Sequence, residues 1–220
     1  MPRALVIVTL LVSSWLLAGK AASAAELHGR VVTGDGSGVA GAVVFVRTPV
    51  PPAPAAGTAA RSAIMDQVDK QFVPHVLPIA VGTAVRFPNH DQIHHHVYSF
   101  SRVKSFDLPL TKDEEAPPVV FDTPGVVKVG CNIHDWMMGV ILIVPTPYFT
   151  TTDDGGAFVL RDAPAGDVTV TAWHEASATS LDDATKRLAL SEAAAQEVTF
   201  TLAVRPDRAR PATHGARGNP

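Results

Sequence analysis

Cysteine is nearly absent from this chain, which has Cys131 alone among its 220 residues. One cysteine cannot form a disulfide within the chain, and it cannot supply both thiols of a Cys-x-x-Cys-His haem attachment. Four-cysteine zinc and iron–sulfur sites are excluded for the same reason, and so is a binuclear copper centre bridged by two thiolates. Any role of cysteine in a metal site must therefore rest on a single thiolate.

Charge is also scarce, because Asp, Glu, Lys and Arg make up only 18% of the residues and the net charge is −3. Basic residues form no block except in the C-terminal segment 205–220, so binding to nucleic acid is not expected. That segment is rich in Pro, Arg and Gly, which predicts a disordered tail. Residues 49–62 are dominated by Pro and Ala, which predicts a stiff connector.

Long apolar runs are limited to residues 4–18, which are fewer than the roughly 20 residues of a membrane span. Arg3 precedes this run and the sequence Ala-Ser-Ala at residues 22–24 follows it. This pattern is typical of a secretory signal peptide, here residues 1–24, cleaved near Ala24. We therefore expect a periplasmic or secreted protein with no membrane span after cleavage, and an uncleaved anchor is the alternative.

Proline and glycine are frequent, with eighteen and sixteen residues, and Val and Thr recur in short alternating runs. This composition predicts an all-β chain. One stretch, about residues 180–195, is rich in Ala, Leu, Lys and Glu, and it is interpreted either as a helix or as a loop between strands. The expected strands are residues 28–33, 42–46, 83–87, 95–100, 126–131, 139–144, 167–173 and 197–204.

The lone cysteine belongs to a pattern that suits a metal. Cys131 is followed by His134 and Met137 at Cys-x2-His-x2-Met spacing, and a run of three histidines occupies residues 94–96. Two imidazoles, one thiolate and a weak axial thioether are the ligands of a mononuclear blue-copper site, which transfers electrons. Alternation along the expected strand 126–131 places the thiol on one face with two valines. The alternative is a buried, inert cysteine.

The middle of the chain resembles the cupredoxins, the plastocyanin and amicyanin family, over residues 63–145. Residues 72–74 and 81–89 are similar to the family's early strands, the step at 95–97 to its His-Asn-Val ligand step, and 131–139 to its short ligand loop. The resemblance implies a Greek-key β-sandwich that holds one copper ion cycling between Cu(I) and Cu(II). The implied ligands are His95, Cys131, His134 and Met137.

Two departures from the family pattern leave alternatives open. His96 stands where the family usually has Asn, so His94 or His96 could replace His95 as the ligand. We favour His95 because it precedes the Val97 that matches the family. Met138 could likewise replace the axial methionine. We favour the methionine at position 137, because it stands two residues before a glycine as the family's ligand does.

The flanking segments, residues 26–48 and 147–204, resemble a carboxypeptidase-regulatory-like, Ig-like β-sandwich. Neither segment has enough strands to bury two sheet faces alone, so the resemblance implies one discontinuous sandwich with the cupredoxin inserted into it. The whole chain also resembles exported cupredoxin-domain proteins labelled as methylamine-utilisation proteins. That label does not identify a substrate.

The resemblance implies an electron carrier in which His134 reaches the surface through an apolar rim of Ile133, Trp136 and Met138. Its partner would be a redox protein such as a cytochrome c or a periplasmic dehydrogenase or oxidase. The alternative is copper storage, delivery or sensing, with a second, looser site formed by other histidines. These are His90, His94 and His96.

An enzyme is not expected, because the chain has neither a second complete ligand set nor a nucleophile motif such as Gly-x-Ser-x-Gly. His75 stands isolated in the sequence. The polar pair His174 and Glu175 follows Trp173 at the end of an expected strand, where we expect packing. Nothing in the sequence indicates an oligomeric state.

Overall fold

A computed structural model describes residues 24–48, 61–110 and 116–205. The predicted signal peptide, connector and tail lie outside these ranges, apart from one or two residues at their edges. In the described part of the chain, no helix is long and apolar enough to cross a membrane.

The described residues form strands and no helix, so the prediction of an all-β chain is confirmed. The strands are β1 (Ala24–Val32), β2 (Val43–Arg47), β3 (Ser62–Ile64), β4 (Asp66–Val68), β5 (Gln71–Val73), β6 (Val76–Ala80), β7 (Thr83–Arg86), β8 (His95–Ser101), β9 (Lys104–Leu110), β10 (Val119–Phe121), β11 (Gly125–Cys131), β12 (His134–Val144), β13 (Phe149–Thr151), β14 (Ala157–Pro164), β15 (Gly166–Trp173), β16 (Thr185–Leu190) and β17 (Gln196–Thr201).

The helix interpretation of residues 180–195 is wrong. The stretch begins with a turn and continues as β16, which pairs antiparallel with β15 from Thr171 opposite Thr185 to Gly166 opposite Leu190. Pairing with an existing sheet edge and burial of Leu190 outweigh the helix propensity of Ala, Leu and Lys, which is a weak local preference.

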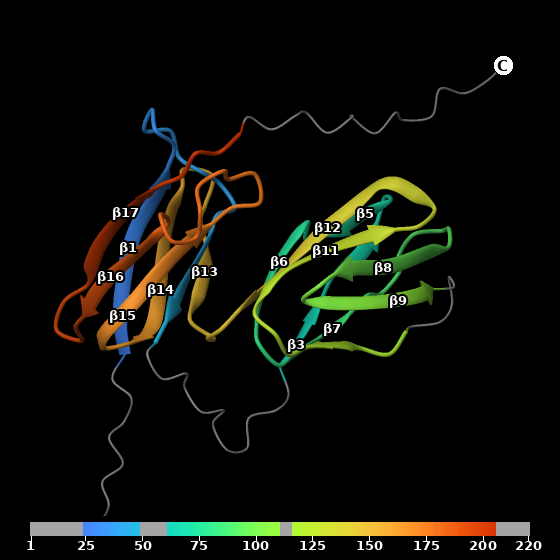
Figure 1. Ribbon diagram of the computed structural model, residues 1–220, viewed down its shortest axis with the longest axis horizontal. Coiled ribbons are helices and arrows are strands. Elements are labelled where there is room, and N and C mark those ends of the chain that lie inside the picture. The colour runs from blue at the N-terminus through green and yellow to red at the C-terminus, as the bar shows by residue number, and fades with distance from the viewer. Residues whose placement is uncertain (1–23, 49–60, 111–115, 206–220) are drawn as a thin grey trace, which may run out of the picture.

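Strands from the two ends of the described chain form what we call the outer sandwich (Figure 1). One sheet has the order β14-β1-β17, in which β1 pairs antiparallel with β14 and parallel with β17. The other has the order β13-β2-β15-β16. Apolar side chains of both sheets share one buried core, which includes Leu27, Val44, Leu160, Val170 and Phe200. Alternation along each strand brings these residues to the inner face.

The strands between β2 and β13 form a second pair of sheets, the central sandwich (Figure 1). The sheet orders are β10-β7-β3 and β6-β12-β11-β8-β9, and a small hairpin joins β4 to β5. A second buried core between these sheets includes Val85, Phe121, Val97, Val129 and Ile141. This core determines which face of β8, β11 and β12 points inward, and so it orients the side chains considered below.

The two sandwiches pack against each other through a third, smaller apolar cluster. Val43 and Phe45 of β2 lie against Leu142 and Val144 of β12, and all four are buried. Burying a side chain of this size contributes about 1.5–3 kcal/mol relative to leaving it in water. We therefore expect the two sandwiches to hold a defined relative orientation.

Candidate metal centre

Cys131 ends β11, where the strand lies between β8 and β12 in the larger sheet of the central sandwich. Val127, Val129 and Cys131 alternate with outward-facing residues, and all three side chains are buried in the central core. The prediction that the thiol shares a face with two valines is therefore confirmed. An irregularity between Gly130 and Cys131 breaks the ladder at the strand end, which gives the chain room to turn.

Two histidines meet the thiol from neighbouring strands. His95 is the first residue of β8, and His134 is the first residue of β12, opposite Cys131 in the β11–β12 pairing. The backbone N–H of Asn132 donates to the carbonyl of His96 at 3.0 Å, which fastens the intervening turn to β8. Strand pairing therefore brings together residues that are 36 positions apart in the sequence.

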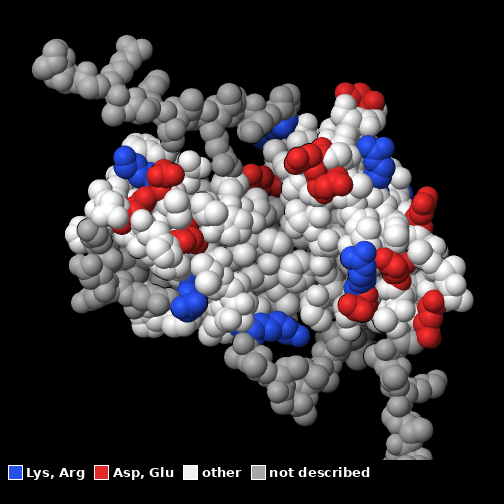
Figure 2. Space-filling view, turned by 180° about the vertical axis from the view of Figure 1, so that it is seen from behind, with Lys and Arg blue, Asp and Glu red and all other residues white. Residues whose placement is uncertain are grey.

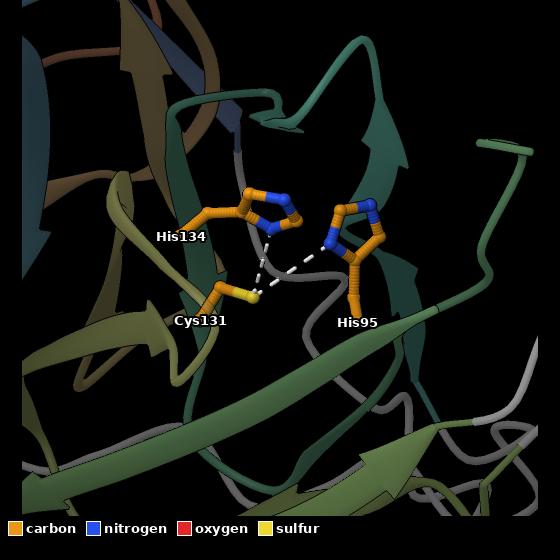
Figure 3. Close-up of side chains that lie close together, drawn as sticks. All are labelled: His95, Cys131 and His134. Atoms are coloured by element: carbon orange, nitrogen blue, oxygen red, sulfur yellow. Dashed lines mark hydrogen bonds between the residues drawn. The ribbon is translucent and has the colours of Figure 1, made fainter. Parts of the chain in front are cut away.

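The donor atoms of the three side chains converge on one point (Figure 3). Cys131 Sγ lies 3.7 Å from Nδ1 of His95 and 3.6 Å from Nδ1 of His134. Nitrogen and sulfur donors about 2.0 and 2.3 Å from a shared metal, as in zinc proteins, would be separated by a similar distance. The three donors therefore fit a single transition-metal ion.

Asp91 fixes the orientation of His95. Its carboxylate lies 2.7 Å from Nε2 of His95 and accepts backbone N–H bonds from Asp69 at 2.6 Å and Lys70 at 2.8 Å. Because a carboxylate accepts, Nε2 of His95 donates to Asp91, and Nδ1 is the ring nitrogen that faces the thiol. Burial opposes ionisation of Asp91, but the bonds from Lys70, His95 and Asp69 hold its carboxyl pKa below the usual range.

The surroundings of His134 favour its neutral form. Burial, followed by the charges of His95 and Lys70, lowers the imidazole pKa of His134 from its ordinary value, and Asp91 opposes this shift. A neutral imidazole is the form that binds a transition metal. The lowered pKa therefore favours the form of His134 that can bind a metal.

The two candidate axial methionines have opposite environments. Met137 is 1% exposed and belongs to the same core cluster as Cys131, whereas Met138 is 50% exposed. Successive residues of a strand point to opposite faces, so only Met137 faces the interior.

The neighbouring histidines do not join the group. Nε2 of His96 contacts the carboxylate of Asp107, and Nδ1 of His90 lies 2.6 Å from Asp66. Within the described ranges, His95, Cys131 and His134 are the only group of three or more His, Cys, Asp or Glu donors placed to hold a metal. That group does not include His90, His94 or His96, so the suggested looser second site stays a prediction.

Asp91→Asn is expected to lower copper affinity about 10- to 100-fold, the usual effect of losing a carboxylate that orients a histidine ligand. The carboxylate of Asp91 now accepts hydrogen bonds from three N–H groups. In either orientation, the side-chain amide of Asn would turn its own N–H donors toward at least one of them. Competition with a copper chelator measures the affinity. Asp107→Asn is the matched control, because Asp107 contacts His96 outside the donor group. Equal affinities for the two variants would contradict this role of Asp91.

His134 stands at the edge of the centre, beside an exposed apolar surface. Trp136 is 64% exposed, and its ring centroid lies 5.4 Å from that of His134. Ile133 and Met138 are also exposed, and we call these three residues the apolar rim.

Comparison with known proteins gives structural likenesses only. No family model and no curated protein sequence matches the chain, so the resemblance of the flanking segments stays a prediction. Matching solved structures include a reduced amicyanin with a Trp-to-Tyr substitution, a Cu(I) amicyanin with a Met-to-Ala substitution and an oxidised amicyanin with a Met-to-Leu substitution.

Each of these structures is 23% identical to the chain and covers 46% of it. The matches cover 98%, 99% and 99% of the amicyanin chains, with TM-scores of 0.36, 0.36 and 0.35. Likeness at this level assigns no role to any residue. The chemistry of the centre must therefore be argued from its own atoms.

Proposed function

We propose that this chain is an exported blue-copper protein that carries single electrons. One copper ion would be held by His95, Cys131, His134 and Met137. The observation that carries the proposal is the convergence of two imidazole Nδ1 atoms on one buried thiol, whose core cluster also contains Met137. Thiolate, two imidazoles and a weak thioether are the ligands that make copper an electron-transfer centre.

The main contribution of the protein would be to hold the proposed ligand side chains in a fixed arrangement. His95 and Cys131 are 1% and 3% exposed, and each stands in a strand of one hydrogen-bonded sheet. Bound copper would supply the one-electron couple between Cu(I) and Cu(II). Because Asp91 and the strand pairing hold the donors before the metal arrives, little has to move when the oxidation state changes.

Electrons would enter and leave near His134, since its ring lies against the exposed Trp136 of the apolar rim. Charged side chains on the face shown in Figure 2 are scattered and of both signs rather than gathered in one basic patch. A small apolar contact suits brief docking with a redox protein, such as a cytochrome c or a periplasmic dehydrogenase or oxidase, below about 1,200 Å² of buried area. Export would follow from cleavage of residues 1–24.

The experiment that tests this function is reduction and reoxidation of the copper-loaded protein in the presence of a weak copper chelator. We expect a reversible wave at an electrode, rapid electron exchange with a soluble cytochrome c, and full retention of copper. Release of copper on reduction, or exchange no faster than the uncatalysed background, would favour storage, delivery or sensing instead.

Met137→Gln should lower the reduction potential, because a harder oxygen donor favours Cu(II) over Cu(I). Met138→Gln should leave the potential nearly unchanged, since the side chain of Met138 is half exposed and lies on the opposite face of β12. Redox titration of the two variants measures both effects. A larger shift for Met138→Gln would reverse the axial assignment.

We also propose that residues 63–145 are a cupredoxin domain inserted into a regulatory-like domain made of residues 26–48 and 147–204. Hydrogen bonds between the end of the first flanking segment and the start of the second support this proposal. Thr146 Oγ1 donates to the carbonyl of Val46, and Val46 N–H donates to the carbonyl of Tyr148 at 2.9 Å. The points where the chain leaves and re-enters the proposed regulatory-like domain are therefore close together.

A chain that lacks residues 60–145 should fold cooperatively, because the core of the outer sandwich stays complete. The deletion would expose Val43 and Phe45 to water, so both are replaced by Thr, which keeps a strand-forming surface and reduces the newly exposed apolar area. Thermal melting by circular dichroism and gel filtration test the folding. A molten or aggregated product would count against the insertion.

A further inference from the structure

His75 connects the strand of the axial methionine to the outer sandwich. Its Nδ1 lies 3.0 Å from the carbonyl oxygen of Met138, and its Nε2 lies 2.8 Å from Oε2 of Glu175. A carbonyl and a carboxylate both accept, so each contact is a hydrogen bond in which a ring nitrogen of His75 is the donor, and the protonated ring makes both at once. The two side chains are mostly shielded from solvent, with 26% and 33% exposed.

The main chain of His75 holds the same segment. Its carbonyl accepts the backbone N–H of Val140 at 2.8 Å, immediately before β6 begins its parallel pairing with β12. The side-chain bond to Met138 therefore extends the ladder toward the metal centre. A Cβ at Gly139 would lie 3.1 Å from Phe72 Cβ and 3.4 Å from the carbonyl oxygen of His75, so the residues that follow Met137 are tightly seated.

The contact between sandwiches places Glu175 at this point. Trp173, two residues before Glu175, and Val76, next to His75, both pack on the small apolar cluster between the sandwiches. The His75–Glu175 pair therefore lies beside the buried apolar cluster, which fixes how the two residues face each other. In Figure 1, β6 and β12 lie on the side of the central sandwich that faces the outer sandwich.

We infer that Glu175 is a positioning residue for the metal centre. Through His75, it holds the carbonyl of Met138 and so restrains the axial side chain of Met137. The outer sandwich would thus help to set the copper environment. The part that concerns copper rests on the proposed function, whereas the restraint of β12 does not.

Glu175→Ala tests the restraint in the protein without metal. Loss of one hydrogen bond of ordinary strength should speed amide hydrogen exchange at residues 138–140 about 2- to 10-fold. Glu175→Gln keeps an acceptor for Nε2 of His75 and should restore exchange close to that of the wild type. The control is Glu197→Ala, because Glu197 is exposed on β17 and forms no ion pair or side-chain hydrogen bond with described residues. If Glu175→Ala matches this control, the proposed restraint is wrong.

The same variants with copper test the effect on the metal. Glu175→Ala should shift the reduction potential and the visible spectrum, and Glu175→Gln and Glu197→Ala should change neither. In a His75→Leu background, Glu175→Ala should have no further effect, since Glu175 acts through His75.

The two readouts separate the possible failures. If Glu175→Ala speeds amide exchange but leaves the reduction potential of copper unchanged, Glu175 contributes only to the stability of the fold. That result would overturn its positioning role. Faster exchange in a protein that binds no copper at all would refute the proposed function but leave the restraint of β12 in place. An undiminished effect in the His75→Leu background would show that Glu175 acts by another route, which also contradicts the inference.

Discussion

Replacing Cys131 by Ser is expected to abolish the intense visible absorption of the protein loaded with Cu(II). That band requires charge transfer from a thiolate to copper, and Cys131 is the only cysteine in the chain. A serine hydroxyl is a hard donor with a far higher pKa than a thiol, so it replaces neither the soft bond nor the band. Absorption spectroscopy with matched copper content makes the comparison.

The histidines offer a control for this result. His95→Gln should also remove the band, because the side chain of His95 is buried beside the thiol. His96→Gln should preserve it, because His96 contacts Asp107 instead. A band that survives in the Cys131→Ser protein, or that depends on His96 rather than His95, would contradict the ligand assignment.

Trp136→Asp should slow electron exchange with a redox partner while leaving the copper spectrum nearly intact. Trp136 is largely exposed beside His134, so its replacement disturbs little of the fold. Docking would desolvate the new carboxylate, and a cost of at least about 1.4 kcal/mol corresponds to a tenfold or greater loss of productive encounters. Stopped-flow mixing with reduced cytochrome c measures the rate.

Leu181→Asp is the matched control, since Leu181 is an exposed apolar residue of the outer sandwich and the charge change is identical. We expect wild-type exchange from this variant. Equal slowing by both substitutions would indicate a general charge effect and remove the apolar rim as the docking surface.

Local patterns in the sequence were sufficient to predict that Cys131 points inward and that His134 lies near it. Alternation along β11 predicted the inward thiol, and the short spacing from Cys131 to His134 required only a tight turn between paired strands. The choice among three consecutive histidines needed the fold, because the start of β8 decides which one faces inward. The structure buries His95 beside the thiol, and its role as a ligand stays a prediction.

Contacts between distant segments could not be found in this way. Asp91 binds backbone groups of Asp69 and Lys70, and that arrangement depends on the β4–β5 hairpin. A carboxylate four residues before His95 was the only signal for it in the sequence. His75 seemed isolated and Glu175 was expected only to pack, yet the two residues, 100 positions apart, form an ion pair. Such pairs depend on how the two sandwiches pack against each other, and the alternation of residues within one strand carries no information about that packing.

The visible absorption spectrum of the wild-type protein loaded with one equivalent of Cu(II) tests the central claim most directly. Coordination by the Cys131 thiolate and the two imidazoles predicts an intense charge-transfer band, bleached by one electron and restored on reoxidation without loss of copper. A spectrum with only weak absorption, typical of copper bound by nitrogen and oxygen donors, would contradict the blue-copper assignment.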